Sequence, residues 1–520
     1  MYMNSKDIQL VLPATDFVTQ ESADRAIRKA LRIGAGQEYM ILRKSIDARR
    51  QDIKFNLLCR VNPQSSQYVP TQFKYADPAN GQVVIIGSGP GGLFAALRLL
   101  EYGIKPVVIE RGSDVHKRKA DIALISREGN VNPSSNYSFG EGGAGTFSDG
   151  KLYTRSKKRG ENEKVLNLFV QFGAKPEILY EAHPHIGTEV LPSIIEKMRN
   201  CILEHGGEFH LDTCMTDLII EKNEVIGCVC KDKEGKEKEF RGPVILAIGN
   251  AARDTFRMLE RRGVEIQAKS IAVGVRLEHP QQIIDNIQYH LNGQRPSYLP
   301  AAEYSFVEQV SGRGVYSFCM CPGGFVVPAA SDKNQVVVNG MSPSNRGSRW
   351  ANSGIVTQIS CEDLAGDSPL KVMEYQAKLE EVSYRAANKT QKAPAQRLTD
   401  FLRGQVSSDL PVSSYAPGLT SADLGTVLPK DVADSLRQGF VQMGRKAYGF
   451  ITDEAMIIGT ETRTSSPVRV VRDPQSFESV SHKGLYPCGE GAGYAGGIVS
   501  AAVDGINCAD HIRTALVIVK

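Results

Sequence analysis

Apolar and polar positions follow several distinct patterns along the chain, and each pattern predicts a different kind of element. Residues 83–86 form a continuous apolar run, which is typical of a strand covered on both faces of a parallel sheet. A glycine-rich turn follows at once, and residues 93–102 then carry apolar side chains at helical spacing. A second apolar run over residues 106–109 ends at Glu110. The pattern predicts a strand, a turn, a helix and a second strand over residues 82–112.

The first 80 residues have the pattern of a small α+β domain followed by a linker. Strands are predicted at residues 8–12, 39–42, 45–49 and 53–61, and a helix at residues 22–33. Pro63, Pro70 and Pro78 indicate a linker over residues 62–81.

The rest of the chain alternates between buried strands and an inserted region. A helix at 188–205, a strand at 207–211, a hairpin at 217–231 and a buried strand at 243–251 are expected to continue the first sheet. Short strands at 271–277, 315–321, 324–327 and 335–338 and helices at 369–387 and 431–443 indicate an α+β insertion. A glycine motif at 484–497 and a helix at 498–512 are expected to return to the first sheet.

The turn Gly87-Ser88-Gly89-Pro90-Gly91-Gly92 is typical of a dinucleotide site. Gly87 makes the tight turn, Gly89 lets the backbone approach a pyrophosphate, and Gly92 lets the helix pack closely on the strand. The free N–H groups and the dipole of the helix then face the phosphates. Glu110, at the end of the second strand, is placed to accept hydrogen bonds from a ribose.

The predicted fold class is therefore α/β, with a Rossmann-like cofactor-binding domain built on a parallel sheet, an inserted α+β domain and a small N-terminal α+β domain. The expected limits are 1–80 for the basic N-terminal domain and linker, 81–270 for the first part of the cofactor domain, 271–458 for the insertion that holds the substrate, and 459–520 for the C-terminal return.

Four dispersed pieces of the chain favour FAD over a nicotinamide cofactor, because an NAD domain normally completes itself in one continuous block. The glycine turn, Glu110, the glycine loop at 140–150 and the pair Gly489-Glu490 suit an extended, tightly held molecule. A helix that begins near Ile498 would point its positive end at the flavin ring. The residues expected to bind FAD are Gly87, Ser88, Gly89, Pro90, Gly91, Gly92, Glu110, Arg111, Gly145, Thr146, Ser148, Asp149, Gly249, Gly489, Glu490, Gly497 and Ile498.

Composition adds few constraints. The chain has 520 residues, 41% of them hydrophobic and 23% charged, and a formal net charge of +4, values typical of a soluble globular protein with several domains. No run of about 18 apolar residues is present and the first residues do not have the pattern of a signal peptide. We therefore expect a cytoplasmic protein without a membrane partner.

The cysteines are scattered, without a CxxC pair. Two CxC pairs occur, Cys228-Val229-Cys230 and Cys319-Met320-Cys321. Alternate residues of a strand face the same side, so the two cysteines of each pair lie close together. Each pair could be two reduced, half-buried thiols. The alternatives are a strained disulfide, a pair of metal ligands or a redox thiol. Half-buried strand thiols are the favoured interpretation, and no metal site is predicted.

Long strings of the sequence resemble those of the uncharacterised FAD-dependent dehydrogenases of the glutathione-reductase-like FAD superfamily, over nearly the whole chain. The strings are KSIDAR at 44–49, GGAGTFSDGK at 142–151, HIGT at 185–188, NGMS at 339–342, ANS at 351–353, ETRTSSPVR at 461–469 and GEGAGYAGGI at 489–498. The resemblance implies bound FAD and a redox role, but it does not supply a substrate. The CxxxxC dithiol and the second nucleotide domain of glutathione-reductase-type enzymes are absent from this sequence.

The substrate is expected in the cleft between the cofactor domain and the insertion. Arg463 is a candidate anchor for a carboxylate or phosphate, or else a structural ion-pair partner of Glu461 or another acid. Asn352 and Ser353 are further substrate candidates, with helix capping as their alternative role. His183 and His185 are acid/base candidates for which a structural role is favoured. The catalytic residues themselves are not predicted.

The sequence thus predicts an FAD-binding dehydrogenase or reductase of an unidentified small organic molecule, with an anionic substrate as the candidate and NAD(P)H as a candidate transient electron donor. Two alternatives stay open. Basic residues on the helix at 22–33, among them Arg25, Arg28, Lys29 and Arg32, suit docking to RNA or a protein partner, although such stripes are usually solvated faces. The second alternative is a regulatory protein that binds FAD but does not catalyse a reaction.

Overall fold

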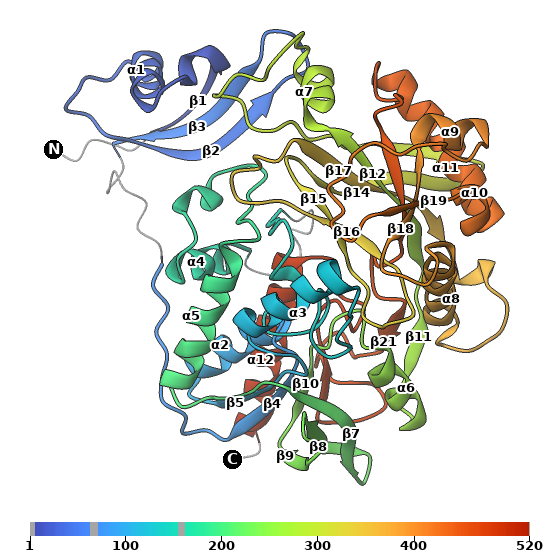
Figure 1. Cartoon of the computed structure of the whole chain (residues 1–520). Helices are drawn as coiled ribbons and strands as arrows, with labels where there is room; N and C mark the ends of the chain where they lie inside the picture. The colour runs from blue at the N-terminus through green and yellow to red at the C-terminus, as the bar shows by residue number, and fades with distance from the viewer. Residues whose placement is uncertain (1–5, 63–70, 154–161, 519–520) are drawn as a thin grey trace.

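The computed structural model describes residues 6–62, 71–153 and 162–518. The N-terminal sheet lies at one end of the molecule, the cofactor domain at the other, and a large mixed layer runs alongside both (Figure 1). The part of the predicted linker at residues 63–70 lies outside the described residues.

A parallel sheet forms the centre of the cofactor domain. Within the described residues its five strands lie in the order β22 (Leu485–Pro487), β10 (Val244–Leu246), β4 (Gln82–Ile86), β5 (Lys105–Ile109) and β6 (Glu208–His210). Because β22 pairs with β10 in parallel, with Val244 opposite Leu485, the expected return of the chain to its first sheet is confirmed. Almost every residue of β4 and β5 is buried, as the continuous apolar runs predict.

Helices cover one face of this sheet and a small antiparallel sheet covers the other. The first face packs against α2 (Pro90–Glu101), α4 (Asn162–Gln171), α5 (Leu191–Glu204) and α12 (Ile498–Ile518). The second face packs against α6 (Arg253–Arg261) and the sheet of β7 (Thr213–Glu221), β8 (Glu224–Asp232) and β9 (Glu237–Arg241). The β7–β8 turn is only Lys222-Asn223, both at positive φ, which matches the right-handed twist of a hairpin.

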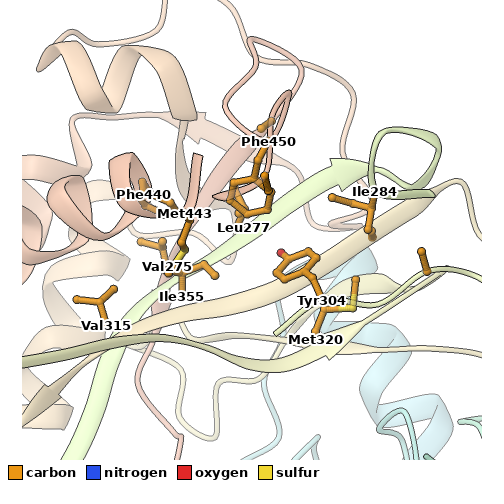
Figure 2. Close-up of a cluster of buried hydrophobic side chains, with 14 of the residues drawn as sticks. Val275, Leu277, Ile284, Tyr304, Val315, Met320, Ile355, Phe440, Met443 and Phe450 are labelled. Carbon is orange, nitrogen blue, oxygen red and sulfur yellow. The ribbon is translucent and has the colours of Figure 1, made fainter. Parts of the chain in front are cut away.

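A mixed sheet forms the second layer. Within the described residues its order is β13 (Val307–Val310), β14 (Arg313–Cys321), β17 (Trp350–Ile359), β12 (Ile271–Pro280), β20 (Met456–Glu461), β18 (Ala393–Arg397) and β19 (Leu419–Ser421). The neighbouring helices are α7 (Gln281–Tyr289), α8 (Lys371–Ala386), α9 (Leu398–Arg403), α10 (Leu424–Val427) and α11 (Lys430–Lys446). Figure 2 shows Phe440 and Met443 of α11 beside Val275 of β12 and Ile355 of β17, in the buried core of this layer.

Smaller elements connect these layers. They are the ribbons β15 (Phe325–Pro328) with β16 (Val338–Met341) and β11 (Ile266–Ala268) with β21 (Val468–Val470), the helix α3 (Val115–Glu128), and the short 3-10 helices η1 (Ala14–Phe17), η2 (Gly143–Gly145), η3 (Pro176–Leu179) and η4 (Cys361–Asp363). The strand predicted at 335–338 was placed too early, since β16 begins at Val338. β20 ends at Glu461, past residue 458, the predicted end of the insertion. The predicted domain limits stay a prediction.

The N-terminal domain is the sheet β1 (Lys6–Pro13), β3 (Lys54–Val61) and β2 (Tyr39–Asp47) with α1 (Gln20–Leu31). The prediction of two separate strands at 39–42 and 45–49 was wrong. A bulge between Ile41 and Arg43 lets one strand, β2, stay paired with β3 along its whole length. The helix begins earlier than predicted because Thr19 and Ser22 form a capping box.

None of the helices in ranges 6–62, 71–153 and 162–518 combines the length and the apolar character needed to cross a bilayer.

Two leucines on the helices of the cofactor domain test this packing. Leu97 on α2 is fully buried and Leu203 on α5 is 46% exposed. We expect Leu97→Ala to lower the free energy of unfolding by about 2–5 kcal/mol, because it leaves a cavity beneath the parallel sheet. We expect Leu203→Ala to change it by less than about 0.5 kcal/mol. Thermal and urea unfolding followed by circular dichroism measure both, and equal losses would contradict the assigned packing.

Candidate functional site

A single continuous cavity of about 270 Å³ lies between the parallel sheet and the mixed sheet. One end is formed by the carboxyl ends of β4 and β5, where ligands of open parallel sheets bind. The other end, called here the far end, is formed by Phe318, Cys319, Asn339, Gly340 and Arg463. The cavity therefore joins residues that are separated by several hundred positions in the sequence.

The glycine turn is shaped by close backbone contacts. Gly87 has φ of +100°, and a Cβ there would lie 2.3 Å from the carbonyl oxygen of Ala247 on the strand beside it. A Cβ on Gly92 would lie 1.9 Å from the carbonyl oxygen of Gly87. Gly89 differs, because its nearest neighbour is the Cα of Gly143 at 3.7 Å and it lines the cavity.

Of the six predicted turn residues, Gly87, Gly89, Pro90 and Gly91 line the cavity. Gly92 lies beneath the turn, where it permits the packing of helix on strand. Ser88 does not line the cavity, and its role as a cofactor residue stays a prediction. The Ser88 side chain is fully buried, and its hydroxyl bonds to Glu110.

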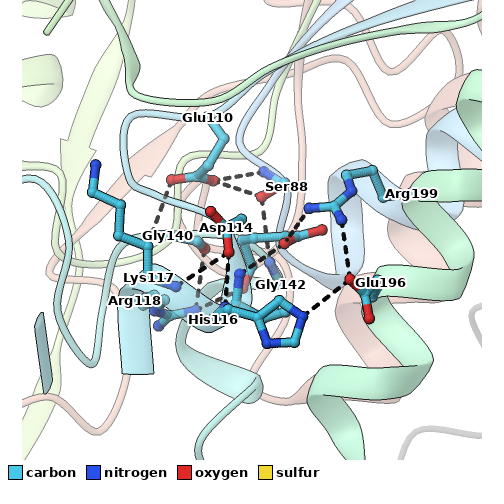
Figure 3. A network of polar contacts seen from close by, with 12 residues as sticks. Ser88, Glu110, Asp114, His116, Lys117, Arg118, Gly140, Gly142, Glu196 and Arg199 are labelled. Atoms are coloured by element: carbon cyan, nitrogen blue, oxygen red, sulfur yellow. Dashed lines mark hydrogen bonds and ion pairs between the residues drawn. The ribbon is translucent and has the colours of Figure 1, made fainter. Parts of the chain in front are cut away.

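Ser88 and Glu110 form a closed network behind the turn (Figure 3). Glu110 Oε2 accepts from the Ser88 backbone N–H at 3.0 Å and from its hydroxyl at 2.8 Å. Glu110 Oε1 accepts from the N–H groups of Gly112 at 2.9 Å and Gly140 at 3.0 Å. Glu110 also lines the cavity. The carboxylate thus ties the glycine turn to the 140 loop, and a ribose hydroxyl would share an oxygen that already has protein partners.

The 140–150 loop is only partly arranged as predicted. Gly145 and Ser148 line the cavity, together with Gly143, Ala144 and Phe147. Thr146 and Asp149 do not. The Thr146 hydroxyl donates to the carbonyl oxygen of Glu141 at 2.9 Å, and Asp149 accepts from Arg346 at 3.2 Å. The sequence could not show the Asp149 contact, because tertiary packing brings Arg346 to it.

Arg118 on α3 is a site-building residue that sequence reasoning missed. Its guanidinium is fully buried and donates to the carbonyl oxygens of Asn136 (2.8 Å), Tyr137 (3.1 Å), Gly140 (3.2 Å) and Glu141 (2.7 Å). Burial lowers the pKa of Arg118 to about 10, so the group stays charged at neutral pH. It holds the glycine loop in a single conformation.

The C-terminal motif reaches the same cavity. Gly489, Glu490, Gly497 and Ile498 line it, and Gly249 lies opposite them. Glu490 Oε1 accepts from the Asn250 side chain at 2.7 Å, and burial raises the pKa of Glu490. Asp504 fixes the motif by accepting the Gly489 N–H at 2.7 Å. Since α12 begins at Ile498, the first turn of a long helix lies against the cavity.

Cys488, Asp504 and Cys508 lie close enough together to resemble a metal ligand set. Arg472 already forms an ion pair with the Asp504 carboxylate, with distances of 2.6 and 2.9 Å to its two oxygens. The Arg472 guanidinium also lies 3.8 Å from Cys508 Sγ. A cation in contact with two of the three groups opposes metal binding, so this cluster is better described as an ion pair with neighbouring thiols.

Arg111 lines the cavity together with Glu110, and its role as a cofactor residue stays a prediction. Its guanidinium lies 4.4 Å from the centre of the Phe139 ring and pairs with Asp254. Phe139 belongs to the cavity wall as well, but the sequence offered only its position beside the glycine loop as a signal.

The three substrate candidates have different positions. Arg463 lines the far end of the cavity and also makes an ion pair with Glu380 at 3.1 Å, so the alternative of a pair with another acid is what the structure shows. Asn352 and Ser353 are fully buried inside β17 and do not line the cavity. Asn352 accepts from Arg276 at 3.3 Å, and Ser353 donates to the Gly354 carbonyl oxygen at 3.0 Å. The capping role was wrong, because both residues lie within a strand and not at a helix terminus. The substrate role stays a prediction, which positions outside the cavity lining do not support.

The remaining predicted acid/base candidates lie away from the cavity. His185 is hydrogen-bonded to the Ser344 carbonyl oxygen at 3.0 Å, and His183 pairs with Glu303. These contacts fit the structural roles favoured from the sequence. Tyr137, Ser138, Phe318, Val327 and Asn339 line the cavity instead, and single polar or aromatic residues of this kind give no distinctive sequence signal.

Comparison with known proteins identifies the family. Residues 80–123 match a model described as FAD binding domain, and residues 270–464 match one described as FAD-dependent protein, C-terminal domain-like. Residues 4–62 match a domain of unknown function. An uncharacterized protein of Clostridium beijerinckii is 40% identical over 494 residues, 91% of each chain. The chain belongs to this family of FAD-dependent proteins. FAD is therefore its cofactor, and its coarse function is that of an FAD-binding oxidoreductase.

Solved structures similar to this FAD-dependent protein are distant. The flavin-dependent brominase Bmp2 is 15% identical with a TM-score of 0.36, covering 84% of this chain and 79% of its own. The quinol fumarate reductase FrdA of E. coli is 12% identical with a TM-score of 0.38, covering 85% and 72%. A geranylgeranyl bacteriochlorophyll reductase-like protein of Thermoplasma acidophilum is 13% identical with a TM-score of 0.35, covering 84% and 79%.

The residues present fit FAD. Backbone without side chains lines the cavity at Gly89, Gly249, Gly496 and Gly497, and a Cβ at the last three would meet nothing within 4 Å. Open, glycine-lined backbone of this kind lets a flat or phosphorylated molecule lie against N–H groups. Bound FAD supplies two-electron redox chemistry. The protein supplies the N-terminus of α2, the carboxylates of Glu110 and Glu490, and walls that exclude water. Which of these residues touch the cofactor stays a prediction.

Gly89 offers a test of the cofactor position. Because the protein leaves room for a methyl group there, we expect Gly89→Ala to fold normally but to weaken FAD binding by about tenfold or more, by blocking the approach of the phosphates. Quenching of FAD fluorescence on titration into apoprotein measures the affinity, with circular dichroism as the check on folding. Gly36→Ala is the matched control, since Gly36 has no neighbour within 4 Å and lies in the N-terminal domain. Unchanged affinity in Gly89→Ala would place the cofactor elsewhere.

Proposed function

We propose that the protein is an FAD-dependent dehydrogenase or reductase that acts on a small organic substrate at the far end of the cavity. The observation that supports this is the continuity of one cavity from the glycine turn to the wall formed by the mixed sheet. Gly89 of the glycine turn and Arg463 of the opposite wall line this same cavity, which gives a second reactant access to the cofactor site.

The charge at the far end favours a substrate with an anionic group. Glu380 of α8 is held between two guanidinium groups, with Arg253 at 2.9 Å and Arg463 at 3.1 Å. Although burial opposes ionisation, the two arginines keep the pKa of Glu380 at about 2. One carboxylate therefore balances only one of two cations. Arg463 is the cation of the pair that reaches the cavity, and it is placed to attract a carboxylate or phosphate.

An electron donor has to reach the flavin by the same route. The proposed donor is NAD(P)H, which binds transiently in the cleft between the cofactor domain and the mixed sheet. A transient donor of this kind does not need a second strand–GxGxxG–helix unit, and the sequence has none. The alternative of RNA or protein docking has less support. On α1, Arg25 pairs with Glu21 at 3.0 Å and Arg28 with Asp24 at 2.8 Å, so part of the basic stripe is neutralised on its own helix.

An anaerobic screen tests the proposal. The protein reconstituted with FAD is mixed with NADH, NADPH and a panel of small hydroxy acids, amino acids and neutral alcohols, and the visible absorbance of the flavin is followed. Bleaching by at least one donor, and recovery with an organic acceptor, is the expected result. A flavin that no member of the panel reduces, and that stays reduced with every organic acceptor after photoreduction, would overturn the proposal.

Arg463 and Arg253 form a matched pair of variants, because both contact Glu380 but only Arg463 lines the cavity. We expect Arg463→Gln to raise KM for an anionic substrate by about tenfold with kcat nearly unchanged, since it removes a contact made before and during reaction. We expect Arg253→Gln to affect thermal stability without this change in KM. Steady-state kinetics with an anionic and a neutral substrate, and melting curves of both variants, provide the comparison. The same KM for both variants would assign Arg463 to the structural ion pair alone.

A further inference from the structure

The far end of the cavity contains a thiol that the proposed function does not use. Cys319 of β14 lines the cavity beside Phe318, and Cys321 is fully buried two residues later. Met320, between them, packs into the hydrophobic core of the mixed sheet, on the side that Figure 2 shows near Tyr304. Cys319 therefore faces the cavity, and Cys321 shares its surroundings, because Lys151 and Asp149 act on both thiols.

A bulge in β14 presents Cys319 to the cavity. Phe318 lies opposite Gly354 and Cys321 opposite Asn352, so β14 has one residue more than β17 over this interval. Cys319 has φ of +46°, a left-handed conformation that is unfavourable for a residue with a side chain. Unfavourable backbone conformations of this kind concentrate at functional sites, where the surrounding packing holds them. The Cys321 sulfur atom lies 3.4 Å from the Cys319 carbonyl oxygen, so the two residues are close together.

Cations from two other segments act on this pair. Arg276 of β12 donates to the Cys319 carbonyl oxygen at 2.8 Å, and Lys151, at the end of the glycine loop, attracts negative charge on both thiols. The acids that face Cys319 are Asp149, Glu461 and Glu490. Arg276 and Glu461 neutralise each other in a buried ion pair at 2.8 Å.

These neighbours stabilise a thiolate at Cys319. The Cys321 thiol as hydrogen-bond donor, followed by Lys151 and Arg276, lowers the pKa of Cys319 although burial opposes this. Burial lowers the pKa of Lys151, but the two neighbouring thiols raise it. The net effect is a raised pKa, so the ammonium group stays charged. Thiolates, not thiols, are the reactive form of cysteine.

The second CxC pair of the chain shows that spacing alone does not produce this environment. Cys228 and Cys230 lie in β8 with their sulfur atoms 3.6 Å apart, and both are completely buried. They do not line the cavity, and the neighbouring thiol and burial raise the pKa of Cys228. This pair has the properties of ordinary buried thiols.

We propose that Cys319 and Cys321 form a redox-active dithiol that exchanges two electrons with the FAD. In one direction, the reduced anionic flavin gives two electrons and one proton to a Cys319–Cys321 disulfide. The sulfur–sulfur bond breaks, Cys321 takes the proton as a thiol, Cys319 remains as a thiolate, and the flavin becomes oxidised FAD. In the reverse direction, oxidised FAD forms the disulfide. The proposal rests on FAD binding and is independent of the small substrate.

Electron counting tests this directly. The full-length protein loaded with FAD is treated with diamide, freed of reagent and titrated anaerobically with dithionite. We expect the wild type to take up twice as many electrons per FAD as Cys319→Ser or Cys321→Ser. Cys228→Ser and Cys230→Ser, the matched controls, are expected to equal the wild type. Equal uptake in the wild type and Cys319→Ser would overturn the proposal.

A second measurement needs neither FAD nor folding of the serine variants. Alkylation of the wild-type apoprotein with iodoacetamide over a pH series, read by mass spectrometry of each cysteine peptide, reports which thiol ionises first. We expect Cys319 to react well below the ordinary thiol pKa of about 8.5, and Cys228 not to react in the folded protein. Lys151→Met removes a cation and is expected to move the Cys319 midpoint to higher pH. A Cys319 midpoint at or above that of an ordinary thiol, or one that Lys151→Met leaves in place, would contradict the thiolate on which the exchange depends.

Discussion

Two helices from opposite ends of the chain meet backbone to backbone, and the cofactor site depends on that contact. A Cβ on Gly505 of α12 would lie 2.0 Å from the carbonyl oxygen of Gly91 on α2, so only glycine permits the approach. Gly91 belongs to the turn at the start of α2, while α12 begins at Ile498, and both ends line the cavity. The contact therefore fixes the distance between the glycine turn and the C-terminal motif, which β22 and β10 also hold together in the sheet.

Buried charges fix the loops around this contact. Glu110 collects four donors from three segments, and Arg118 donates to four carbonyl oxygens of the segment 136–141. A loop outside any sheet or helix leaves its backbone groups without regular partners, and a buried ion that satisfies several of them replaces those partners. Removal of either charge would leave the groups that bond to it buried without a partner. Such groups are costly in a low-dielectric interior. The site is thus preorganised by side chains that contact the backbone.

The sequence was most informative where the constraint is local. Continuous apolar runs predicted β4 and β5, and the glycine spacing predicted the turn, because both depend on neighbours within a few residues. It failed where the partner is distant. Asn352 was considered as a substrate or helix-capping residue, but it lies in an interior strand of the mixed sheet and its amide meets Arg276 on the neighbouring strand. Arg118 stands in an ordinary charged segment, and nothing near it in the sequence indicates that it is fully buried.

The electrostatics of the cavity connect its two ends. The first turns of α2 and α12 both line the cavity, and each presents the positive end of a helix dipole to it. Arg463 and Lys151 add positive charge beyond them, whereas Glu461 is already paired with Arg276. Under the proposed function, this positive potential would attract the phosphates of FAD and the ring that gains negative charge on reduction. Under the proposed dithiol exchange, the same dipoles and cations would also stabilise the Cys319 thiolate.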